Sequence, residues 1–488
     1  MNRMRTHVAV VVSAAVAAGL WIYLHRRHVD GEPNDQLAPP RQLRLALFTL
    51  EYRFQTFSGN GIYSIAQANS LAAIGHKVLV VCAAPGSSSS SSSGGSNGNP
   101  TEILLPVPDD SWGSLAKDGG WVHYVKAASS AATVAAVRAW KPDAILPVDW
   151  HGFAAASPII DSYTPGVKQP PVVWLNYRVF SRSATAASSS DAAGETASAA
   201  ASDSAAFYRQ MEGAAAKQAS RTVALARADE ALLKDLGGTS ATTVLLPALR
   251  DDIKQLADKL LAGAPTPRSE VGSSPPTNAR ILLVCCVRLS PEKGGLLFAE
   301  VVHHLAHFLT AAGITPVLCA APAPKTASYR AHVVDAFMAA NVPGSRVIPD
   351  FIGAEELAAL QSAALLNFHP PTYDAYGMTV VEAAAFGSPS VLHAPAEHAV
   401  SAHGGTSEST DGVGAAELLR PSRGESFHVD LSAEASVVAA AVQTLLSDRP
   451  RLQQVGEAAQ ARALSWTVND NALNLAEIVH GELRKMRH

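Results

Sequence analysis

The feature that most constrains this chain of 488 residues is a repeated alternation of short aliphatic runs with helix-length segments. Residues 43–48 form a run that is apolar except for Arg44, residues 62–74 have the length of a helix that ends at Gly75, and residues 77–82 are again mostly apolar and rich in valine. Apolar runs without polar alternation are typical of strands that are buried on both faces. The pattern therefore predicts a β-α-β unit in a parallel sheet covered by helices.

The alternation occurs in two cycles along the chain. Strand-like runs of the first cycle are residues 43–48, 77–82, 144–148, 172–175, 222–226 and 243–246, and those of the second are 281–287, 316–320, 346–349, 364–369 and 390–393. A chain of this length is too long for one hydrophobic core. The predicted fold class is therefore α/β, with two Rossmann-like doubly wound domains and a cleft between them.

Composition sets the predicted boundaries of these domains. Residues 43–261 are assigned to the first domain and residues 280–430 to the second. Between them, residues 262–279 are rich in Pro, Gly and Ser and predict a linker. Residues 431–488 carry helical apolar stripes, so we expect C-terminal helices that cross back to the first domain.

Two low-complexity stretches interrupt the first domain. Residues 85–100 contain a serine tract, and residues 181–206 are dominated by Ala and Ser. Neither stretch has the large apolar side chains that offset the entropy cost of ordering a chain. Both are predicted to be mobile insertions.

The N-terminal region has the pattern of a membrane anchor. Residues 8–24 are uncharged and flanked by basic residues, and as a helix they would span about 25 Å, with Trp21 and Tyr23 at one interface. A cleaved signal peptide is the alternative, but Leu24 is followed by His and Arg instead of a small-residue cleavage site. Residues 1–42 are therefore predicted to be a transmembrane anchor and linker.

The orientation of that anchor stays open because both flanks are basic. No Asn-x-Ser/Thr sequon occurs in the chain, which favours a catalytic portion that faces the cytosol. The expected location is the membrane of the endoplasmic reticulum or Golgi.

The charge and the cysteine spacing argue against a nucleic-acid-binding protein and against a metal site formed by cysteines. The 38 basic and 42 acidic residues give a net charge of −4, so no basic field is present to bind nucleic acid. The cysteines lie in apolar strand-like runs and lack the spacing of metal ligands: Cys82, Cys285, Cys286 and Cys319. They are expected to be buried free thiols, and no metal site is predicted.

A glycine-containing loop follows the first predicted strand. Gly59, Asn60 and Gly61 precede a predicted helix. Glycines allow backbone N–H groups to approach a ligand, and a helix N-terminus favours an anion. The loop is a candidate donor-binding segment, with a plain tight turn as the alternative.

The loop after the first strand of the second domain carries two cations. Arg288 and Lys293 are five residues apart in the sequence RLSPEKGG. A guanidinium fork and an ammonium group can converge there on a diphosphate. A solvated loop with ordinary surface ion pairs is the alternative.

A third loop combines two acids with a helix that begins at a glycine. Asp374 precedes Gly377, and Glu382 lies on the second turn of the predicted helix. One acid could reach a sugar and the other a ribose, while N–H groups at residues 377–379 meet a phosphate. The donor-binding candidates in this loop are Tyr376, Gly377, Met378, Thr379 and Glu382.

Together, the three loops resemble those of the retaining, nucleotide-sugar-dependent family 4 glycosyltransferases of GT-B fold. Asp374-x7-Glu382 is similar to the family's Glu-x7-Glu element, and Arg288 and Lys293 match its diphosphate clamp. The Asp at position 374 departs from the more frequent Glu and shortens the carboxylate's reach by one methylene.

The resemblance extends over about residues 43 to 485. Residues 59–61 match the family's N-terminal glycine loop, and residues 75–78 (GHKV) match the Gly-His-x-Val that follows it. Residues 148–152 (VDWHG) look like the segment in which related synthases place an active-site histidine beside the transferred sugar, which here is His151. A structural histidine is the alternative reading of His151.

The resemblance implies an enzyme that moves a hexosyl unit from a UDP- or GDP-linked sugar to an acceptor hydroxyl with retention of configuration, and the run at residues 8–24 adds the expectation of a membrane anchor. The acceptor, whether glycan, lipid or protein, stays open, and neither a metal nor a separate cofactor is implied. The implied catalytic residues are His151, Arg288, Lys293, Asp374 and Glu382. A nucleotide-sugar epimerase and a catalytically silent, membrane-tethered protein on the same scaffold are the alternatives.

Overall fold

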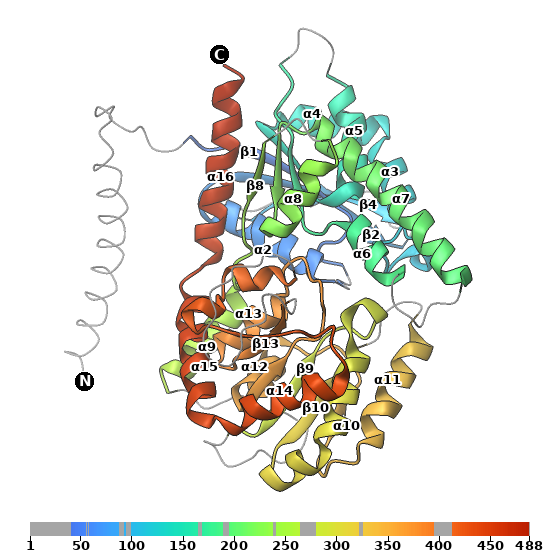
Figure 1. Ribbon diagram of the computed structural model, residues 1–488. Helices are drawn as coiled ribbons and strands as arrows, with labels where there is room; N and C mark the ends of the chain where they lie inside the picture. Colours follow the sequence, from blue (N-terminus) through green and yellow to red (C-terminus); the bar gives the residue numbers. More distant parts are fainter. Residues whose placement is uncertain are drawn as a thin grey trace, which may run out of the picture. The chain divides into compact units, whose positions relative to one another are not determined.

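The computed structural model describes residues 41–487, except 55, 57, 87–91, 94–98, 164–167, 189–194, 238–240, 264–279, 322–325 and 395–411. The predicted anchor at residues 8–24 and most of the predicted linker at 262–279 lie outside the described residues. The part of the chain from Leu43 onward forms one compact unit with two sheets (Figure 1).

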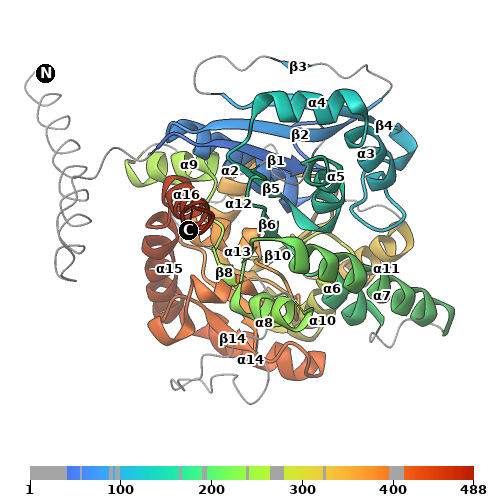
Figure 2. The same cartoon turned by 90° about the horizontal axis from the view of Figure 1, so that it is seen from above.

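The first lobe is built on a sheet in the order β3-β4-β2-β1-β5, extended by the piece β6-β7-β8. Its strands are β1 (Arg44–Thr49), β2 (Lys77–Pro85), β3 (Ser92–Ser93), β4 (Thr101–Val107), β5 (Ala144–Pro147), β6 (Val173–Asn176), β7 (Arg221–Ala224) and β8 (Thr242–Val244). Two parallel bridges, Ile145 to Val172 and Val148 to Leu175, join β5 to β6. The ladders are parallel except where β3 pairs with β4 at the sheet edge (Figure 2).

The second lobe has a parallel sheet in the order β11-β10-β9-β12-β13-β14. Its strands are β9 (Leu282–Cys286), β10 (Thr315–Cys319), β11 (Arg346–Ile348), β12 (Ala364–Phe368), β13 (Ser390–His393) and β14 (Phe427–Val429). Every predicted strand-like run overlaps one of the observed strands, so the predicted pair of parallel sheets is confirmed. Strands β3, β4 and β14 were not predicted: β3 lies in the serine tract, β4 contains Pro106, and β14 has only three residues.

Helices cover both sheets. Those that follow first-lobe strands are α2 (Gly59–Ala73), α3 (Trp121–Ala128), α4 (Ala131–Trp140), α5 (Asp149–Asp161), α6 (Phe180–Ser188), α7 (Glu195–Gln218) and α8 (Arg227–Asp235). The others are α9 (Asp251–Leu261), α10 (Gly295–Ala312), α11 (Ala327–Ala339), α12 (Ala354–Ala363), α13 (Met378–Ala385), α14 (Ala435–Ser447), α15 (Arg449–Leu464) and α16 (Val468–Lys485).

The stretch 181–206 differs from the expected mobile insertion. Apart from residues 189–194, which are outside the described residues, it belongs to α6 and α7. Alanine has the highest helix propensity, and the aromatic side chains of Phe180 and Tyr208 at the two ends are buried against Trp150. Apolar anchors outside the low-complexity stretch therefore hold helices that its own composition did not predict.

The last helices divide between the lobes. Helices α14 and α15 pack on α10 and α13 of the second lobe, whereas α16 packs against α2 of the first (Figure 1). Asn471 of α16 donates to the Tyr63 hydroxyl of α2, and Arg221 of β7 pairs with Glu482. In the opposite direction, α9, which was assigned by sequence to the first domain, packs on α12 and α13 of the second lobe. The chain therefore crosses between the lobes twice.

Among the described residues, α10 has the length and apolar composition of a membrane span. Its apolar side chains are buried in the second core, with Phe298, Val301, Val302 and Leu309 fully enclosed. The helix packs beside α11 and α14, so its apolar composition is explained by its position in the core of the second lobe.

Gly456 offers a test of how closely α15 packs on the second lobe. A Cβ at this position would lie 2.3 Å from the carbonyl oxygen of Gly387, a backbone atom with little freedom to move. We expect Gly456→Ala to lower the free energy of unfolding by about 1–3 kcal/mol, measured by urea denaturation. The matched control is Gly481→Ala in α16, where a Cβ meets nothing within 4 Å. An equal effect of the two substitutions would contradict the packing argument.

Candidate functional site

A cavity of about 670 Å³ is lined by segments that follow strands of both sheets. The predicted site residues that line it are Gly59, Asn60, Arg288, Lys293, Asp374, Tyr376, Gly377, Met378, Thr379 and Glu382. Ligands of doubly wound sheets bind at the carboxyl ends of the strands, so the cavity lies where the topology predicts a site. Of the predicted residues, Gly61 and His151 are outside the cavity lining in the described part of the chain.

Lys293 is held in place by Asp374, the acid that was predicted to lie near the sugar. Its Nζ lies 2.8 Å from Oδ2 of Asp374, and Nε2 of His369 lies 3.4 Å from the same oxygen. Burial acts to raise the pKa of Asp374, but the Lys293 ammonium and the His369 ring outweigh it and hold this pKa well below its usual value. Asp374 is therefore ionised and shares its negative charge with Lys293.

Arg288 has a different partner. Its Nη2 lies 3.5 Å from Oε1 of Glu292, in the short 3-10 turn Pro291–Lys293. Within the described residues, its buried Nε has no hydrogen-bond acceptor. Burial lowers the pKa of Arg288, yet a guanidinium stays charged at neutral pH. A buried charged donor without an acceptor marks a position where a ligand oxygen would be stabilised.

Glu382 is buried, although an isolated helix carboxylate would by default face solvent. Its Oε1 lies 3.4 Å from Nη1 of Arg250, which directly precedes α9. Burial raises the pKa of Glu382, while the Arg250 charge opposes that rise. Arg250 also lines the cavity, so it is a site residue that the sequence analysis missed.

The N-terminus of α13 faces the cavity through residues 377–379. Gly377 has a φ of +85°, and a Cβ there would lie 3.0 Å from Val413 and 3.3 Å from Nε2 of His369. Glycine is therefore required at this turn both by conformation and by space. The free N–H groups of the first helical turn are available to an anion.

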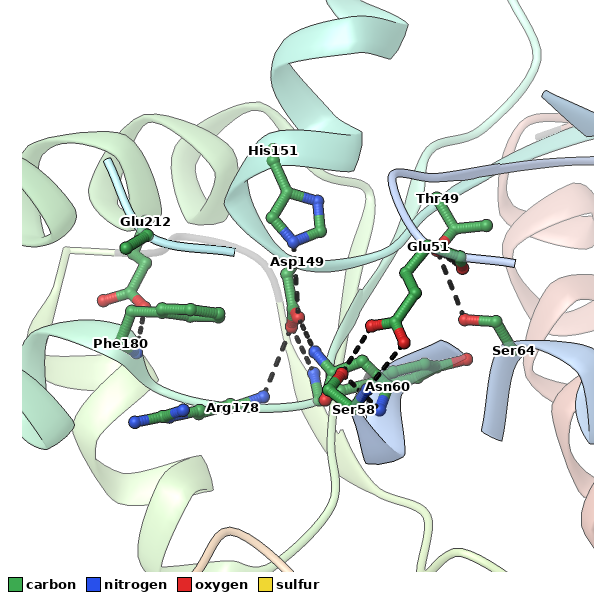
Figure 3. A network of polar contacts seen from close by, with 12 residues as sticks. Thr49, Glu51, Ser58, Asn60, Ser64, Asp149, His151, Arg178, Phe180 and Glu212 are labelled. Carbon is green, nitrogen blue, oxygen red and sulfur yellow. Dashed lines mark hydrogen bonds and ion pairs between the residues drawn. The ribbon is translucent and has the colours of Figure 1, made fainter. Parts of the chain in front are cut away.

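The glycine loop of the first lobe is organised around a carboxylate of the chain itself (Figure 3). Glu51 accepts hydrogen bonds from the Ser58 backbone N–H at 2.7 Å and from the Ser58 hydroxyl, and Ser58 in turn caps α2. A Cβ on Gly61 would lie 2.6 Å from the Glu51 side chain. The absence of a side chain at Gly61 therefore makes room for Glu51.

Asp149 connects three segments of the first lobe (Figure 3). It is fully buried with a φ of +53°, and its Oδ1 accepts the backbone N–H groups of Tyr177 at 2.7 Å and Arg178 at 3.3 Å. Its Oδ2 accepts from the side-chain amide of Asn60. Burial raises the pKa of Asp149 to about 8, against the effect of these donors. Asn60 thus links the glycine loop to the start of α5.

His151 lies next to this network and outside the cavity lining. Its ring is fully buried, and its Nε2 is 3.9 Å from Oδ2 of Asp149, beyond hydrogen-bond distance. Neither ring nitrogen has a hydrogen-bond partner among the described residues. Burial lowers the pKa of His151 to about 3, so the ring is neutral. The ring packs on Trp150 and Phe180.

The cavity lining includes charged residues that the sequence did not predict, among them Arg178, Arg250 and Glu292. Arg178 lies two residues after the end of β6. A charged residue at the carboxyl end of a parallel strand is a candidate ligand contact, so this position could have been predicted. Nothing in the local sequence marks Arg250, because its role depends on α9 lying against the second lobe. Within the described residues, no group of three or more His, Cys, Asp or Glu side chains is placed to hold a metal ion.

No protein-family model and no curated protein sequence matches the chain significantly. Solved structures do match. Sucrose-phosphate synthase from Thermosynechococcus elongatus is 16% identical, with a TM-score of 0.65 over 90% of this chain and 99% of that chain.

Two further structures are similar. The Anabaena protein HepE, solved with UDP and glucose, is 16% identical with a TM-score of 0.55 over 90% of this chain and 100% of that chain. The UDP-forming α,α-trehalose-phosphate synthase from Burkholderia xenovorans, solved with glucose 6-phosphate, is 12% identical with a TM-score of 0.62 over 90% of this chain and 100% of that chain. The described lobes therefore have the predicted GT-B fold.

The ion pair of Asp374 generates a pH prediction. Its pKa is lower in the folded protein than in the unfolded chain, where it is about 3.9, so its stabilisation is present above that pH and is lost as the pH falls. We expect Asp374→Asn to lower the free energy of unfolding at about pH 7 and to have a smaller effect near pH 3.

Urea unfolding of both proteins at the two pH values provides the measurement. Asp203→Asn serves as the control, because Asp203 forms a surface ion pair with Lys117 and is 77% exposed. If Asp374→Asn lowered the free energy of unfolding equally at both pH values, the ion pair of Asp374 and Lys293 would not be the source of the predicted pH dependence.

Proposed function

We propose that this protein is a retaining glycosyltransferase that transfers a hexosyl unit from a nucleotide-diphosphate sugar to an acceptor hydroxyl. The observation that supports this most is the convergence of Arg288, Lys293 and the N-terminus of α13 on one interlobe cavity. These groups supply positive charge where a sugar diphosphate would place its negative charge. The likeness to a structure solved with UDP and glucose agrees with this donor class.

The chemistry requires charge stabilisation more than a strong nucleophile. Cleavage of the sugar–phosphate bond leaves an oxocarbenium-like carbon and a diphosphate that gains negative charge. Arg288 would donate to the diphosphate through its unpartnered Nε, and Lys293 would exchange Asp374 for a phosphate oxygen. Both cations are positioned before the ligand arrives, so little reorganisation is needed during the reaction.

Retention follows if a phosphate oxygen of the leaving group takes the proton of the acceptor hydroxyl on the same face. Asp374, once released by Lys293, would bind a sugar hydroxyl, and Glu382 would bind the nucleotide ribose. The Asn60 and Gly59 loop would face the transferred sugar from the first lobe. His151 is given no contact with the substrate, because its ring is fully buried and outside the cavity lining.

We further propose that residues 8–24 hold the protein in the membrane of the endoplasmic reticulum or Golgi, with the catalytic lobes in the cytosol. The uncharged run and its basic flanks are the support for this proposal. Protease protection in sealed microsomes tests it: digestion of the lobes without detergent is the expected result, and protected lobes would reverse the proposed orientation.

Lys293→Ala tests the diphosphate clamp. We expect the variant to lose transfer, because the diphosphate loses its ammonium partner, and to stay folded at the assay temperature with a lower unfolding temperature, because Asp374 loses its ion pair. Lys234→Ala is the matched control, since Lys234 is 57% exposed and pairs with Glu230 on α8. Turnover near the wild-type level in Lys293→Ala would refute the clamp.

Binding and product analysis separate this proposal from its alternatives. Saturation with UDP or GDP at about 100 times the dissociation constant should stabilise the wild type by about 2.7 kcal/mol. No stabilisation by either nucleotide would identify a silent protein. Conversion of the donor to an epimeric sugar without an acceptor would identify an epimerase instead.

A further inference from the structure

The first lobe contributes its own cation to the cavity. Arg178 lines the cavity two residues after β6. Its backbone N–H donates to the buried Asp149, its Nε donates to Oγ of Ser183 at 2.8 Å, and its guanidinium lies 5.1 Å from the centre of the Phe180 ring. Figure 3 shows the side chain extending away from Asp149. Arg178 is therefore held in a defined position before any ligand binds.

The second lobe approaches Arg178 at the loop of the diphosphate clamp. Helix α6, which carries Ser183, contacts the turn Pro291–Lys293. Burial acts to raise the pKa of Glu292, but the charges of Arg178 and Arg288 hold it below its usual value, while burial and the charge of Arg178 both lower the pKa of Arg288. Arg178 and Arg288 thus line the same cavity from opposite lobes.

Two guanidinium groups in a partly buried cavity repel each other unless anions compensate them. Glu292 is the carboxylate placed to do so, and its contact with Arg288 is long at 3.5 Å. The Nε of Arg288 has no acceptor within the described residues. An anion with more than one charge and several oxygens would satisfy these donors better than Glu292 alone.

We propose that Arg178 and Arg288 form an anion subsite that spans the two lobes and binds a phosphate group of a substrate. The proposal rests on the proposed function and adds a first-lobe residue to its substrate contacts. The phosphate belongs either to the donor diphosphate or to a phosphorylated acceptor, since both ligands present the same oxygens. In either case Glu292 competes with the ligand for the two arginines.

Two opposite effects on affinity test the subsite. We expect Arg178→Ala to weaken phosphate binding by roughly 10- to 100-fold, because a charge-assisted hydrogen bond is lost, and Arg178→Lys to restore part of it. Glu292→Gln should instead tighten binding several-fold, because the competing carboxylate is removed. A purely structural role of this cluster would not produce effects of opposite sign.

The measurement is calorimetric titration of the full-length protein, with UDP in one arm and glucose 6-phosphate in the other. Loss of affinity confined to UDP assigns the subsite to the donor diphosphate, and loss confined to glucose 6-phosphate assigns it to an acceptor phosphate. Arg209→Ala, an exposed arginine on α7, is the control. Thermal unfolding of each variant shows that it is folded.

The failures of the two proposals are distinguishable. Wild-type binding of UDP combined with unchanged affinity of Arg178→Ala for both ligands overturns the subsite and leaves the proposed function standing. A wild type that binds neither UDP, GDP nor glucose 6-phosphate overturns both. If Arg178→Ala fails to fold, Ser183→Ala replaces it: loss of the hydrogen bond to Nε should weaken phosphate binding, and unchanged affinity would overturn the subsite.

Discussion

The site depends on the pairing of its cations with carboxylates of the chain itself. Lys293 is paired with Asp374, Arg288 with Glu292, and Arg250 with Glu382. Without these acids, several positive charges would be confined in one cavity at a high electrostatic cost. The pairs therefore keep the cations in place, and a diphosphate can bind by exchanging partners instead of by reorganising the loops.

The same pairing connects the lobes. Arg250 approaches the second lobe from the segment that crosses between the domains, and Tyr373 of the second lobe donates to the buried carboxyl of Asp229 on α8. Burial raises the pKa of Asp229 to about 7. Arg182 lies 4.2 Å from the centre of the Tyr373 ring. Of these residues, Arg250 and Glu382 also line the cavity, so this ion pair belongs both to the lobe contact and to the site.

Sequence periodicity predicted most strands of the sheets but not every segment around them. Buried parallel strands are continuous apolar runs, so their positions could be read directly. Helices α6 and α7 were missed because their anchors, Phe180 and Tyr208, lie outside the Ala- and Ser-rich stretch. His151 was expected beside the sugar, but burial against Trp150 and Phe180 removes it from the cavity lining. Local sequence shows residue types at a strand end and not the direction in which each side chain points.

The sequence by itself determined the two parallel sheets and the loops that hold Arg288, Lys293, Asp374 and Glu382. Regular alternation of strands and helices gives a doubly wound sheet, and the loops at the carboxyl ends of its strands lie at one edge. Only the tertiary structure decided which charges pair across these loops. Arg178 and Arg250 reach the cavity from segments far along the chain, and Glu51 occupies the space next to Gly61. Electrostatic pairing depends on distances of a few ångströms between such segments, and those distances are set by the packing of the lobes.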